Sequence, residues 1–517
     1  MANNIMQQQK ELESKLWAMC NTLRTNMEAY EFKNYILGMI FYYYLSKREE
    51  DYMTNLLKDD GITFEEAWSD EEFQDAVIEE ALRDLGYIIE PHYLFSEMVK
   101  LVENKNFDVE YLQAAINSIM ESTMGTDSQE DFAGLFDDMQ LDSTKLGRTV
   151  KDRSLIMSKI IASLADITLS IDDTKIDILG NAYEYLIGMF AASAGKKAGE
   201  FYTPAGPAEL LSMLACDGLT DIQDVCDPCA GSGSLLLRVG NHAKVRRYWG
   251  QELTSQTYNL CRMNLILRGI KYKNFRIYNG DTIAEDNFGD KRFRVQVANP
   301  PYSAHIQKPD LMPDDPRFNT YGKYAPKTKA DFAFLQHMVH HMDDDGRIAV
   351  LLPHGVLFRG NAEETIRRYM IEKLNVIDAI IGLPANLFFG TSIPVSIIVC
   401  KKNRNGNKNN ILFIDASKDY ISGKNQNVLG DIHTQKIYKA YQERKDIERF
   451  AHVASLDEIA ENDFNLNIPR YVDTSEPVPE IDLKKVSCEI KDIDDEILNV
   501  SNELKQSFDE LGLEFPF

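Results

Sequence analysis

The sequence has 517 residues, of which 44% are hydrophobic, and its formal net charge is −25. This length predicts roughly two to four domains, and the hydrophobic fraction excludes a globally disordered chain. The negative charge excludes a protein that holds nucleic acid by itself, because such proteins normally carry a basic face. Either the substrate is not a nucleic acid, or a basic partner supplies most of the contact.

No segment has the pattern of a membrane span or of a signal peptide. The longest apolar run, Tyr35 to Leu45, is too short to cross a bilayer. The first residues lack a charged region followed by an apolar one. The seven cysteines form no regular framework, which is typical of a reducing cytosol. We therefore expect a cytoplasmic protein with no membrane partner.

Residues 1–165 carry helical patterns and no residues at catalytic spacing. An acidic segment, 59–84, is typical of a solvated helical surface. We predict an N-terminal all-helical interaction domain over 1–165. The apolar residues at helical spacing are Leu12, Leu16, Met19, Cys20 and Leu23, and then Phe32, Tyr35, Ile36 and Met39.

Between residues 166 and 415, short apolar strands alternate with helices, which predicts an α/β domain with a parallel sheet. Thr203-Pro204 favours a helix that starts near Pro207. Seven strand candidates in one run predict a single doubly wound, Rossmann-like domain. They are Ile222 to Cys226, Tyr248 to Glu252, Phe275 to Ile277, Phe293 to Ala298, Gly346 to Pro353, Val376 to Leu383 and Val395 to Lys401.

The remaining chain is polar and helical in pattern. We predict a helical extension over 416–477 and a C-terminal helix over 478–517. The apolar residues of that last helix alternate at spacings of three and four, which indicates a three-heptad seam. Such a seam suits a coiled coil with a partner, or a helix that lies on its own core. The seam residues are Leu483, Val486, Ile490, Ile493, Ile497, Val500 and Leu504.

A glycine-rich turn follows the first predicted strand of the α/β domain. Its sequence is Asp-Pro-Cys-Ala-Gly-Ser-Gly-Ser, from Asp227 to Ser234. Glycines at such a strand-to-helix turn let a ligand approach the backbone closely. The candidate cofactor-binding residues here are Asp227, Gly231, Ser232, Gly233 and Ser234.

Acidic residues end the next two predicted strands. Glu252 lies 21 residues after Gly231, the offset at which a carboxylate accepts hydrogen bonds from ribose hydroxyls. Asp281 follows the third strand and is placed to meet an adenine amine. No pyrophosphate-type Gly-x-Gly-x-x-Gly is present. The expected ligand is therefore a nucleoside without phosphates, and S-adenosylmethionine is one.

The fourth predicted strand ends in Asn299-Pro300-Pro301-Tyr302. The prolines fix φ and remove two backbone donors, so a carboxamide and an aromatic ring are held at the strand end where ligands bind. The Asn299 oxygen and the Pro300 carbonyl would accept the two N–H bonds of a ring-attached amine and thereby activate it for methylation. Tyr302 would stack on the ring. A plain strand-to-loop turn would use the same residues.

Three other groups of residues have weaker patterns. Cys226 and Cys229 form a C-x-x-C inside the glycine-rich turn, and we interpret them as small packing residues. His337, His340 and His341 have no acidic partner at metal-site spacing, so we predict no metal site there. After Tyr302, basic and aromatic residues interleave as in nucleic-acid grooves. A solvated loop has the same composition, but the position next to the Asn-Pro-Pro-Tyr motif favours contact with the substrate. They are Arg317, Phe318, Tyr321, Lys323, Tyr324, Lys327 and Lys329.

The motifs together resemble the modification (M) subunit of type I restriction-modification systems, an adenine-N6 DNA methyltransferase. The resemblance covers nearly the whole chain and includes both terminal parts. It rests on Phe32 to Gly38, Gly199 to Pro204, Asp227 to Ser234, Gly250 to Glu252, Asn299 to Tyr302, Lys329 to Phe334, Leu387 to Thr391 and Asn462 to Ile468.

The resemblance implies roles and partners. Asn299, Pro300, Pro301 and Tyr302 would hold a flipped adenine of double-stranded DNA. Glu252 would bind the cofactor ribose and Asp281 its adenine. Two M subunits would bind one specificity (S) subunit, and restriction (R) subunits would complete an ATP-dependent nuclease. The residues implied to contact the methionine end of S-adenosylmethionine are Glu200, Phe201, Tyr202, Thr203, Pro204 and Ala205.

Two other functions fit parts of the sequence. An Asn-Pro-Pro-Tyr methyltransferase could act on a protein glutamine or an RNA base, but such enzymes need neither the helical N-terminus nor the heptad tail. A non-catalytic assembly subunit would keep the fold without the chemistry, and the intact Asn299, Glu252 and glycine turn argue against it. We expect the chain itself to catalyse methyl transfer, with the S subunit choosing the DNA sequence.

Overall fold

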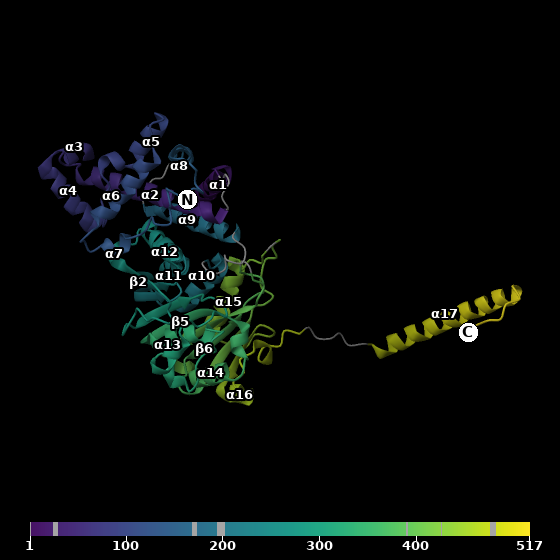
Figure 1. Cartoon of the computed structure of the whole chain (residues 1–517). Helices are drawn as coiled ribbons and strands as arrows, with labels where there is room; N and C mark the ends of the chain where they lie inside the picture. Colours follow the sequence, from purple (N-terminus) through teal and green to yellow (C-terminus); the bar gives the residue numbers. More distant parts are fainter. Residues whose placement is uncertain are drawn as a thin grey trace. The chain divides into compact units, whose positions relative to one another are not determined.

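The computed structural model describes residues 2–23, 29–167, 173–193, 202–388, 391–424, 426–475 and 482–516. They form two compact units, Met1–Asp473 and Thr474–Phe517 (Figure 1). The larger unit holds the N-terminal helices and a nine-stranded sheet. The smaller unit holds one long helix.

The elements described in residues 1–165 are all helical, as predicted. Side chains on most of α2 are buried, among them Phe32, Ile36 and Phe41, so the apolar run at 35–45 is a core helix. No helix in the described ranges is long and apolar enough to cross a membrane. The α-helices of this range are α1 (Ala2–Leu23), α2 (Ala29–Leu56), α3 (Phe64–Ser69), α4 (Glu71–Asp84), α5 (Phe95–Glu103), α6 (Val109–Ser122), α7 (Gln129–Phe132) and α8 (Val150–Ala165), and α9 (Asp173–Ser193) follows it.

Side-chain caps fix where several of these helices begin. Thr63 and Glu66 form a reciprocal capping box at the start of α3, and Thr149 and Asp152 form another at α8. The Asp108 carboxylate accepts from the backbone of α6. Each cap satisfies backbone donors that have no partner inside the helix. The first residues of these helices are therefore determined by neighbouring residues in the sequence.

The sheet has the strand order β3-β2-β1-β4-β5-β7-β6-β8-β9. Strand β7 runs antiparallel to both of its neighbours, and β9 runs antiparallel to β8. The prediction of a parallel sheet over residues 166–415 was therefore wrong for β7, whereas β9 lies outside that range. The bounds are β1 (Asp221–Asp227), β2 (Lys244–Glu252), β3 (Phe275–Asn279), β4 (Phe293–Ala298), β5 (Met342–Pro353), β6 (Ile377–Gly382), β7 (Val395–Lys401), β8 (Asn410–Asp415) and β9 (Ala451–Ser455).

The seven predicted strands correspond to β1 through β7, and the sheet continues beyond them. Strand β8 ends at the predicted boundary of residue 415, and β9 pairs with it from inside the segment predicted as a helical extension. That segment therefore contributes an edge strand to the sheet as well as two helices. The prediction of a purely helical extension over 416–477 was wrong in this respect.

Both faces of the sheet are buried, and successive residues of a strand point to opposite faces. Along β5, Ala349 and Leu351 belong to one core, whereas Ile348 and Val350 belong to the other. Helices α10, α11, α12 and α15 contribute to the first core, which is continuous with that of the N-terminal helices, and α13 and α14 contribute to the second. Their bounds are α10 (Ala205–Cys216), α11 (Ser234–His242), α12 (Ser255–Leu267), α13 (Asp331–His340), α14 (Ala362–Glu372), α15 (Asp431–Glu443) and α16 (Leu456–Glu461).

This topology brings the predicted motifs to one edge. Strands β3, β2, β1 and β4 are parallel neighbours, so their carboxyl ends lie side by side. Strand order reverses between β1 and β4, which makes a crevice at that edge. The glycine turn, the two acidic strand ends and Asn-Pro-Pro-Tyr all follow these four strands.

The C-terminal helix α17 (Leu483–Glu510) starts at Asp482, whose carboxylate accepts from the backbone N–H groups of Lys484 and Lys485. No residue of α17 is buried. The seven predicted seam residues are exposed, from 38% for Val486 to 77% for Leu483. The seam thus presents an apolar stripe to solvent within its own unit.

We predict that ending the chain after Asp473 leaves the larger unit as stable as before. Because α17 buries none of its own residues, its removal should change the thermal midpoint by less than about 2 °C. Differential scanning calorimetry would measure this. As a positive control, Leu351→Ala in the core should cost about 2–5 kcal/mol. A midpoint lowered by truncation as much as by Leu351→Ala would contradict the prediction.

Candidate active site

The glycine turn between β1 and α11 depends on two left-handed residues. Gly231 has φ +54° and Gly233 has φ +77°, which only glycine adopts without strain. A Cβ on Gly233 would also lie 2.9 Å from the Cys261 Sγ atom of α12. Gly233 is the residue that precedes α11. These glycines let the backbone turn sharply and approach a ligand, as the sequence predicts.

Asp227 is buried where β1 ends, with 1% of its surface exposed. Its Oδ1 atom accepts from the Cys229 backbone N–H at 2.9 Å. Burial raises the pKa of Asp227 to about 8, because the charged form loses its hydration and the neighbouring Glu252 adds repulsion, against the opposing hydrogen bond from Cys229. The carboxyl therefore changes charge near neutral pH.

Glu252 joins the ends of β1 and β2. One carboxylate oxygen accepts from the Gly231 N–H at 3.0 Å, and the other accepts from the Thr254 N–H at 2.9 Å. Burial raises the pKa of Glu252, although these backbone donors favour its charged form. Glu252 also lines the larger of the two hollows at this edge, where its carboxylate can accept from ligand hydroxyls.

Asp281 stands just beyond β3. Its Oδ1 atom accepts from the N–H groups of Ile283 and Ala284 at 3.0 and 3.2 Å, and thereby caps a turn. The Thr282 hydroxyl donates to the Pro228 carbonyl at 2.6 Å and ties this turn to the glycine turn. The Oδ2 atom of Asp281 makes no hydrogen bond to the described residues, so one acceptor remains for a ligand.

These strand ends surround two adjoining hollows. The larger, of about 260 Å³, is lined by Glu252, Asp281 and Asn299 together with apolar side chains of Ile283, Pro301 and Phe334. The smaller is lined by Tyr202, Thr203, Asp227, Gly231, Ser232 and Ser234. Asn299 and Cys229 line both. Asp227, Glu252, Asp281 and Asn299 therefore lie around one continuous site.

The Asn299 side-chain amide is held from two directions. Its Nδ2 atom donates to Thr203 Oγ1 at 3.1 Å, and its Oδ1 atom accepts from the Tyr302 hydroxyl at 2.8 Å. Thr203 precedes α10 and Tyr302 follows β4. Two segments far apart in the sequence thus fix one carboxamide where the two hollows meet.

The backbone after Tyr302 is also fixed. Ser303 has φ +53°, an unfavourable value for a residue with a Cβ, and its N–H donates to Asp331 Oδ1 at 2.7 Å. The buried Asp331 also accepts from Arg359 Nη1 at 3.1 Å. The Pro300 carbonyl accepts no hydrogen bond from the described residues. The turn therefore presents that carbonyl and the Asn299 oxygen as acceptors.

Phe388 is a site residue that our sequence reasoning did not single out. Its ring meets the Tyr302 ring edge-on, with centroids 6.0 Å apart and an interplanar angle of 83°. Phe388 falls within Leu387 to Thr391, one of the segments on which the family resemblance rests, so that motif was the available signal. The two rings form an aromatic corner beside the Asn299 amide.

Some predicted residues do not line the hollows. Pro204 precedes α10, Ala205 begins it and Gly233 shapes the turn before α11. Pro300 and Tyr302 line neither hollow, although the Tyr302 hydroxyl donates to Asn299. Glu200 and Phe201 lie outside the described residues. Cys229, interpreted from sequence as a packing residue, lines both hollows and is a free thiol.

The loop predicted as a possible nucleic-acid groove divides into two sets. Arg317, Phe318 and Tyr321 are buried, so the prediction that they contact substrate was wrong. Lys323, Tyr324 and Lys327 are exposed, and Lys329 is half-buried. The loop therefore contributes to the core through one set and offers charge and an aromatic ring to solvent through the other.

Comparison with known proteins identifies relatives over the whole chain. A model of the N-6 DNA Methylase family matches residues 174–478, and a model of the HsdM N-terminal domain matches residues 12–164. The chain is 35% identical to the type I restriction enzyme MpnII methylase subunit of Mycoplasma pneumoniae over 98% of both chains. It is 31% identical to the MjaVII methylase subunit of Methanocaldococcus jannaschii, over 80% of this chain and 71% of that one.

A solved structure has the same architecture. It is the methyltransferase subunit of a type I restriction-modification system from Streptococcus thermophilus, with 42% sequence identity and a TM-score of 0.84. The similarity covers 90% of this chain and all of that one.

We predict that Asp227 makes stability fall as pH rises. The folded carboxyl keeps its proton up to about pH 8, whereas its ordinary pKa is 3.8. Between these values the unfolded chain binds fewer protons, so the free energy of unfolding decreases with pH. Asp227→Asn should remove up to about 1.4 kcal/mol of this decrease per pH unit. Urea unfolding at pH 5, 6, 7 and 8 would measure it.

The exposed Asp344 provides a matched control, and Asp344→Asn should keep the slope of the wild type. Parallel pH curves for the wild type and Asp227→Asn would show that Asp227 is ionised in the folded protein at neutral pH, against the prediction.

Proposed function

The chain belongs to the methylase subunits of type I restriction enzymes and is an N6-adenine DNA methyltransferase; from this premise, we propose that S-adenosylmethionine is its methyl donor and that Asn299 to Tyr302 hold the target adenine of double-stranded DNA. The observation that carries the proposal is the Asn299 amide, which is held between Thr203 and Tyr302 at the junction of the two hollows.

The larger hollow suits an adenosine. Glu252 would accept hydrogen bonds from the ribose hydroxyls, and the Asp281 Oδ2 atom would accept one from the adenine amine. Ile283, Pro301 and Phe334 would contact the faces of the flat ring. The described residues that line the two hollows include no lysine or arginine, so they offer no countercharge for a pyrophosphate. This donor set favours a nucleoside without phosphates.

The smaller hollow suits the methionine end of the cofactor. Asp227 offers a carboxylate there, and Thr203, Ser232 and Ser234 offer hydroxyls. An ammonium group beside Asp227 would favour its ionised form and lower its raised pKa. When bound, S-adenosylmethionine supplies a methyl group on a positively charged sulfur. Asn299 lines both hollows, so the methyl group would lie close to the catalytic turn.

The acceptors at Asn299 and Pro300 would prepare the target nitrogen. The lone pair of adenine N6 is delocalised into the ring, so the amine is a weak nucleophile. Hydrogen bonds from its two N–H groups to Asn299 Oδ1 and to the Pro300 carbonyl would increase electron density on the nitrogen. Because both acceptors are fixed before the reaction, they need little reorganisation during it.

Tyr302 and Phe388 would hold the ring of the target base. Their edge-on contact forms a corner in which an extruded base can stack on one ring and meet the other. The Tyr302 hydroxyl donates to Asn299, so the same side chain would align the base and orient the carboxamide. A base inside a duplex cannot reach this corner, and we infer that the target adenine is flipped.

The charge of the chain limits what it does alone. With a net charge of −25, it has little affinity for the DNA backbone overall. We infer that a specificity subunit supplies most of the DNA contact, with two copies of this chain for each specificity subunit, and that restriction subunits join the complete nuclease. The exposed seam of α17 is the surface we assign to this assembly.

We predict that Asn299→Ala lowers kcat by about 100-fold or more, because it removes a preorganised acceptor at the reacting nitrogen. Transfer of labelled methyl from S-adenosylmethionine to DNA, measured with the specificity subunit present, would test this. Asn117→Ala, at an exposed position of α6, should retain full activity. Label in protein or RNA instead of DNA, or an unchanged rate for Asn299→Ala, would overturn the proposal.

We predict that the seam of α17 is needed to bind the specificity subunit. Ile493→Asp combined with Ile497→Asp should abolish co-purification, because charges would replace two central apolar contacts. Leu498→Asp is the matched control: Leu498 is 60% exposed on the same helix but lies outside the seam, so this change should preserve binding. Equal binding by both variants would rule out the seam as the contact.

A further inference from the structure

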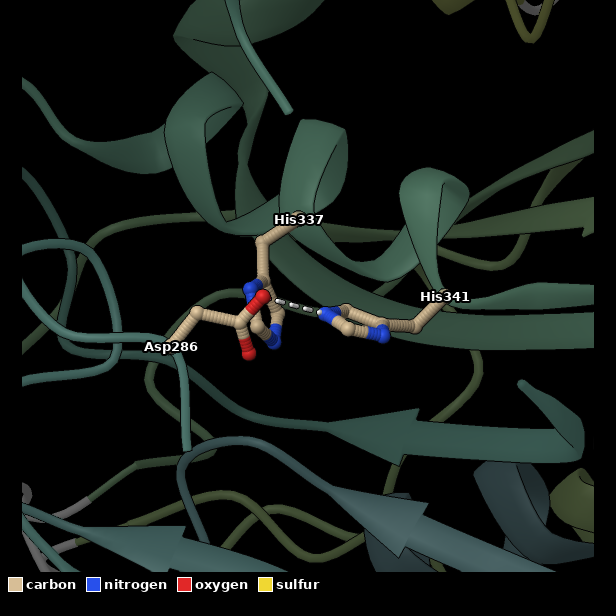
Figure 2. Close-up of side chains that lie close together, drawn as sticks. All are labelled: Asp286, His337 and His341. Carbon is tan, nitrogen blue, oxygen red and sulfur yellow. Dashed lines mark hydrogen bonds and ion pairs between the residues drawn. The ribbon is translucent and has the colours of Figure 1, made fainter. Parts of the chain in front are cut away.

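A buried polar cluster lies beside the larger hollow, which we call the adenosine hollow. The cluster is formed by the C-terminal end of α13, the residue after it and the loop that follows β3. It contains Asp286, His337 and His341 (Figure 2), with one ligating atom of each within 4.8 Å of the others. His337 and His341 are fully buried. The sequence has no acidic residue at metal-site spacing from these histidines, but the fold brings Asp286 to them from a distant segment.

The cluster is already occupied by a cation of the chain itself. Arg317 is 3% exposed, and its Nη1 atom lies 3.0 Å from His337 Nδ1, while its Nε atom lies 4.0 Å from Asp286 Oδ2. A divalent metal between these ligands would stand against the guanidinium charge. In addition, a histidine that binds a metal donates its second nitrogen to an acceptor, whereas His337 Nδ1 faces a donor. The cluster therefore suits an arginine rather than a metal.

Every N–H group of the Arg317 guanidinium has a partner. Nε donates to Asp315 at 3.0 Å, and Nη2 donates to the same carboxylate at 2.6 Å. Nη1 donates to the Thr282 carbonyl at 2.7 Å and faces His337, and Nη2 also donates to the Ile283 carbonyl at 2.9 Å. All five N–H donors of the planar Arg317 guanidinium therefore have an acceptor.

The protonation of the cluster agrees with this arrangement. Burial lowers the pKa of His337 well below its ordinary value, assisted by repulsion from His341 and Arg317, so His337 is neutral and its Nδ1 accepts from the guanidinium. Burial opposes ionisation of Asp286, but the hydrogen bond from His341 and the nearby cationic groups outweigh it and lower the pKa of this carboxyl. His341 also contacts the Lys291 carbonyl at 2.7 Å.

The two carbonyls held by Arg317 belong to the adenosine hollow. Thr282 and Ile283 line it directly, and the Ile283 N–H is one of the two groups that fix the Asp281 carboxylate. Further along the same loop, Asp286 Oδ2 contacts His341 Nε2 at 3.0 Å. The loop that carries Asp281 is therefore anchored on its rear side by side chains that do not touch the hollow.

We propose that Arg317 is a positioning residue for the adenine end of the cofactor: by holding the Thr282 and Ile283 carbonyls, it fixes the direction in which Asp281 offers its free oxygen. This inference rests on the proposed use of S-adenosylmethionine and adds to it the residue that sets selectivity for the adenine amine. Lysine cannot replace arginine here, because a single ammonium cannot reach both carbonyls and Asp315 in the same geometry.

The test uses Arg317→Lys in the full chain and two probes that differ at the C6 amine and at N1, which is protonated in the 6-oxo purine. 5′-Methylthioadenosine carries the amine and 5′-methylthioinosine carries a carbonyl in its place. Competition against labelled S-adenosylmethionine gives the affinity of each. The wild type should prefer the adenosine by about tenfold or more, because a fixed acceptor rejects a ligand without the donor. Arg317→Lys should reduce this preference to about twofold.

Kinetics with DNA and the specificity subunit should show an effect on cofactor binding and little effect on the chemical step. KM for S-adenosylmethionine should rise by about tenfold, whereas kcat at saturating cofactor should stay within about twofold, because Arg317 does not contact the reacting atoms. Arg404→Lys is the matched control. Arg404 is equally buried and bonds Asp378, Asn375 and the Asn410 carbonyl near the amino ends of β6 and β8. It should keep the wild-type preference.

The outcomes separate this inference from the proposed function. A wild-type chain that binds no S-adenosylmethionine would remove the proposed function and this inference with it. A wild type that binds S-adenosylmethionine and prefers the adenosine, with the same preference in Arg317→Lys, would overturn the inference alone. If Arg317→Lys does not fold, Asp315→Asn weakens the hydrogen bonds that hold the Arg317 guanidinium while the guanidinium remains. An unchanged preference for the adenosine in Asp315→Asn would also overturn the inference.

Discussion

The rest of the site depends on the two hydrogen bonds that hold the Asn299 carboxamide. A side-chain amide at the end of a strand is free to rotate unless both of its polar atoms have partners. Here Thr203 and Tyr302 supply one partner each. Thr203 belongs to the segment before α10 and Tyr302 to the turn after β4, so the acceptor that we propose for the target amine is fixed only when the sheet and that segment are both in place.

Much of the fold follows from local patterns. Strands β1 to β7 were predictable because each is an apolar run between turn residues, and the acidic and glycine-rich motifs were placed by the strand ends they follow. The direction of β7 was not predictable, because Val395–Lys401 is buried almost throughout and such a run looks the same in parallel and antiparallel pairing. Strand β9 was missed since an edge strand with half-exposed residues, such as Ala451–Ser455, has a weak pattern.

Site residues could be predicted from the sequence where both the residue type and the position at a strand end indicated a ligand contact. They could not be predicted where burial against distant residues determines what the side chain does. Glu252 and Asp281 end strands, so their residue type and their place pointed to the same role. Arg317 was misinterpreted because basic and aromatic neighbours in a loop look like a nucleic-acid groove. Its burial depends on the carbonyls of Thr282 and Ile283, 35 and 34 residues away, which no local pattern contains. The nearby Asp315 was the one local sign of an internal partner.

Helix α13 connects these separate parts of the site. At its first residue, Asp331 accepts from the Ser303 N–H and fixes the turn that carries Tyr302. Near its other end, His337 faces the Arg317 guanidinium, which anchors the loop that carries Asp281, and His341, directly after the helix, contacts Asp286. Ten helical residues span about 15 Å and are stiff over that length. Methyl transfer requires donor and acceptor atoms to be held close and in line. A rigid element that binds the Tyr302 turn at one end and the Asp281 loop at the other would meet this requirement under the proposed function. It gives a reason for the polar side chains at both ends of a helix that is otherwise buried in the core.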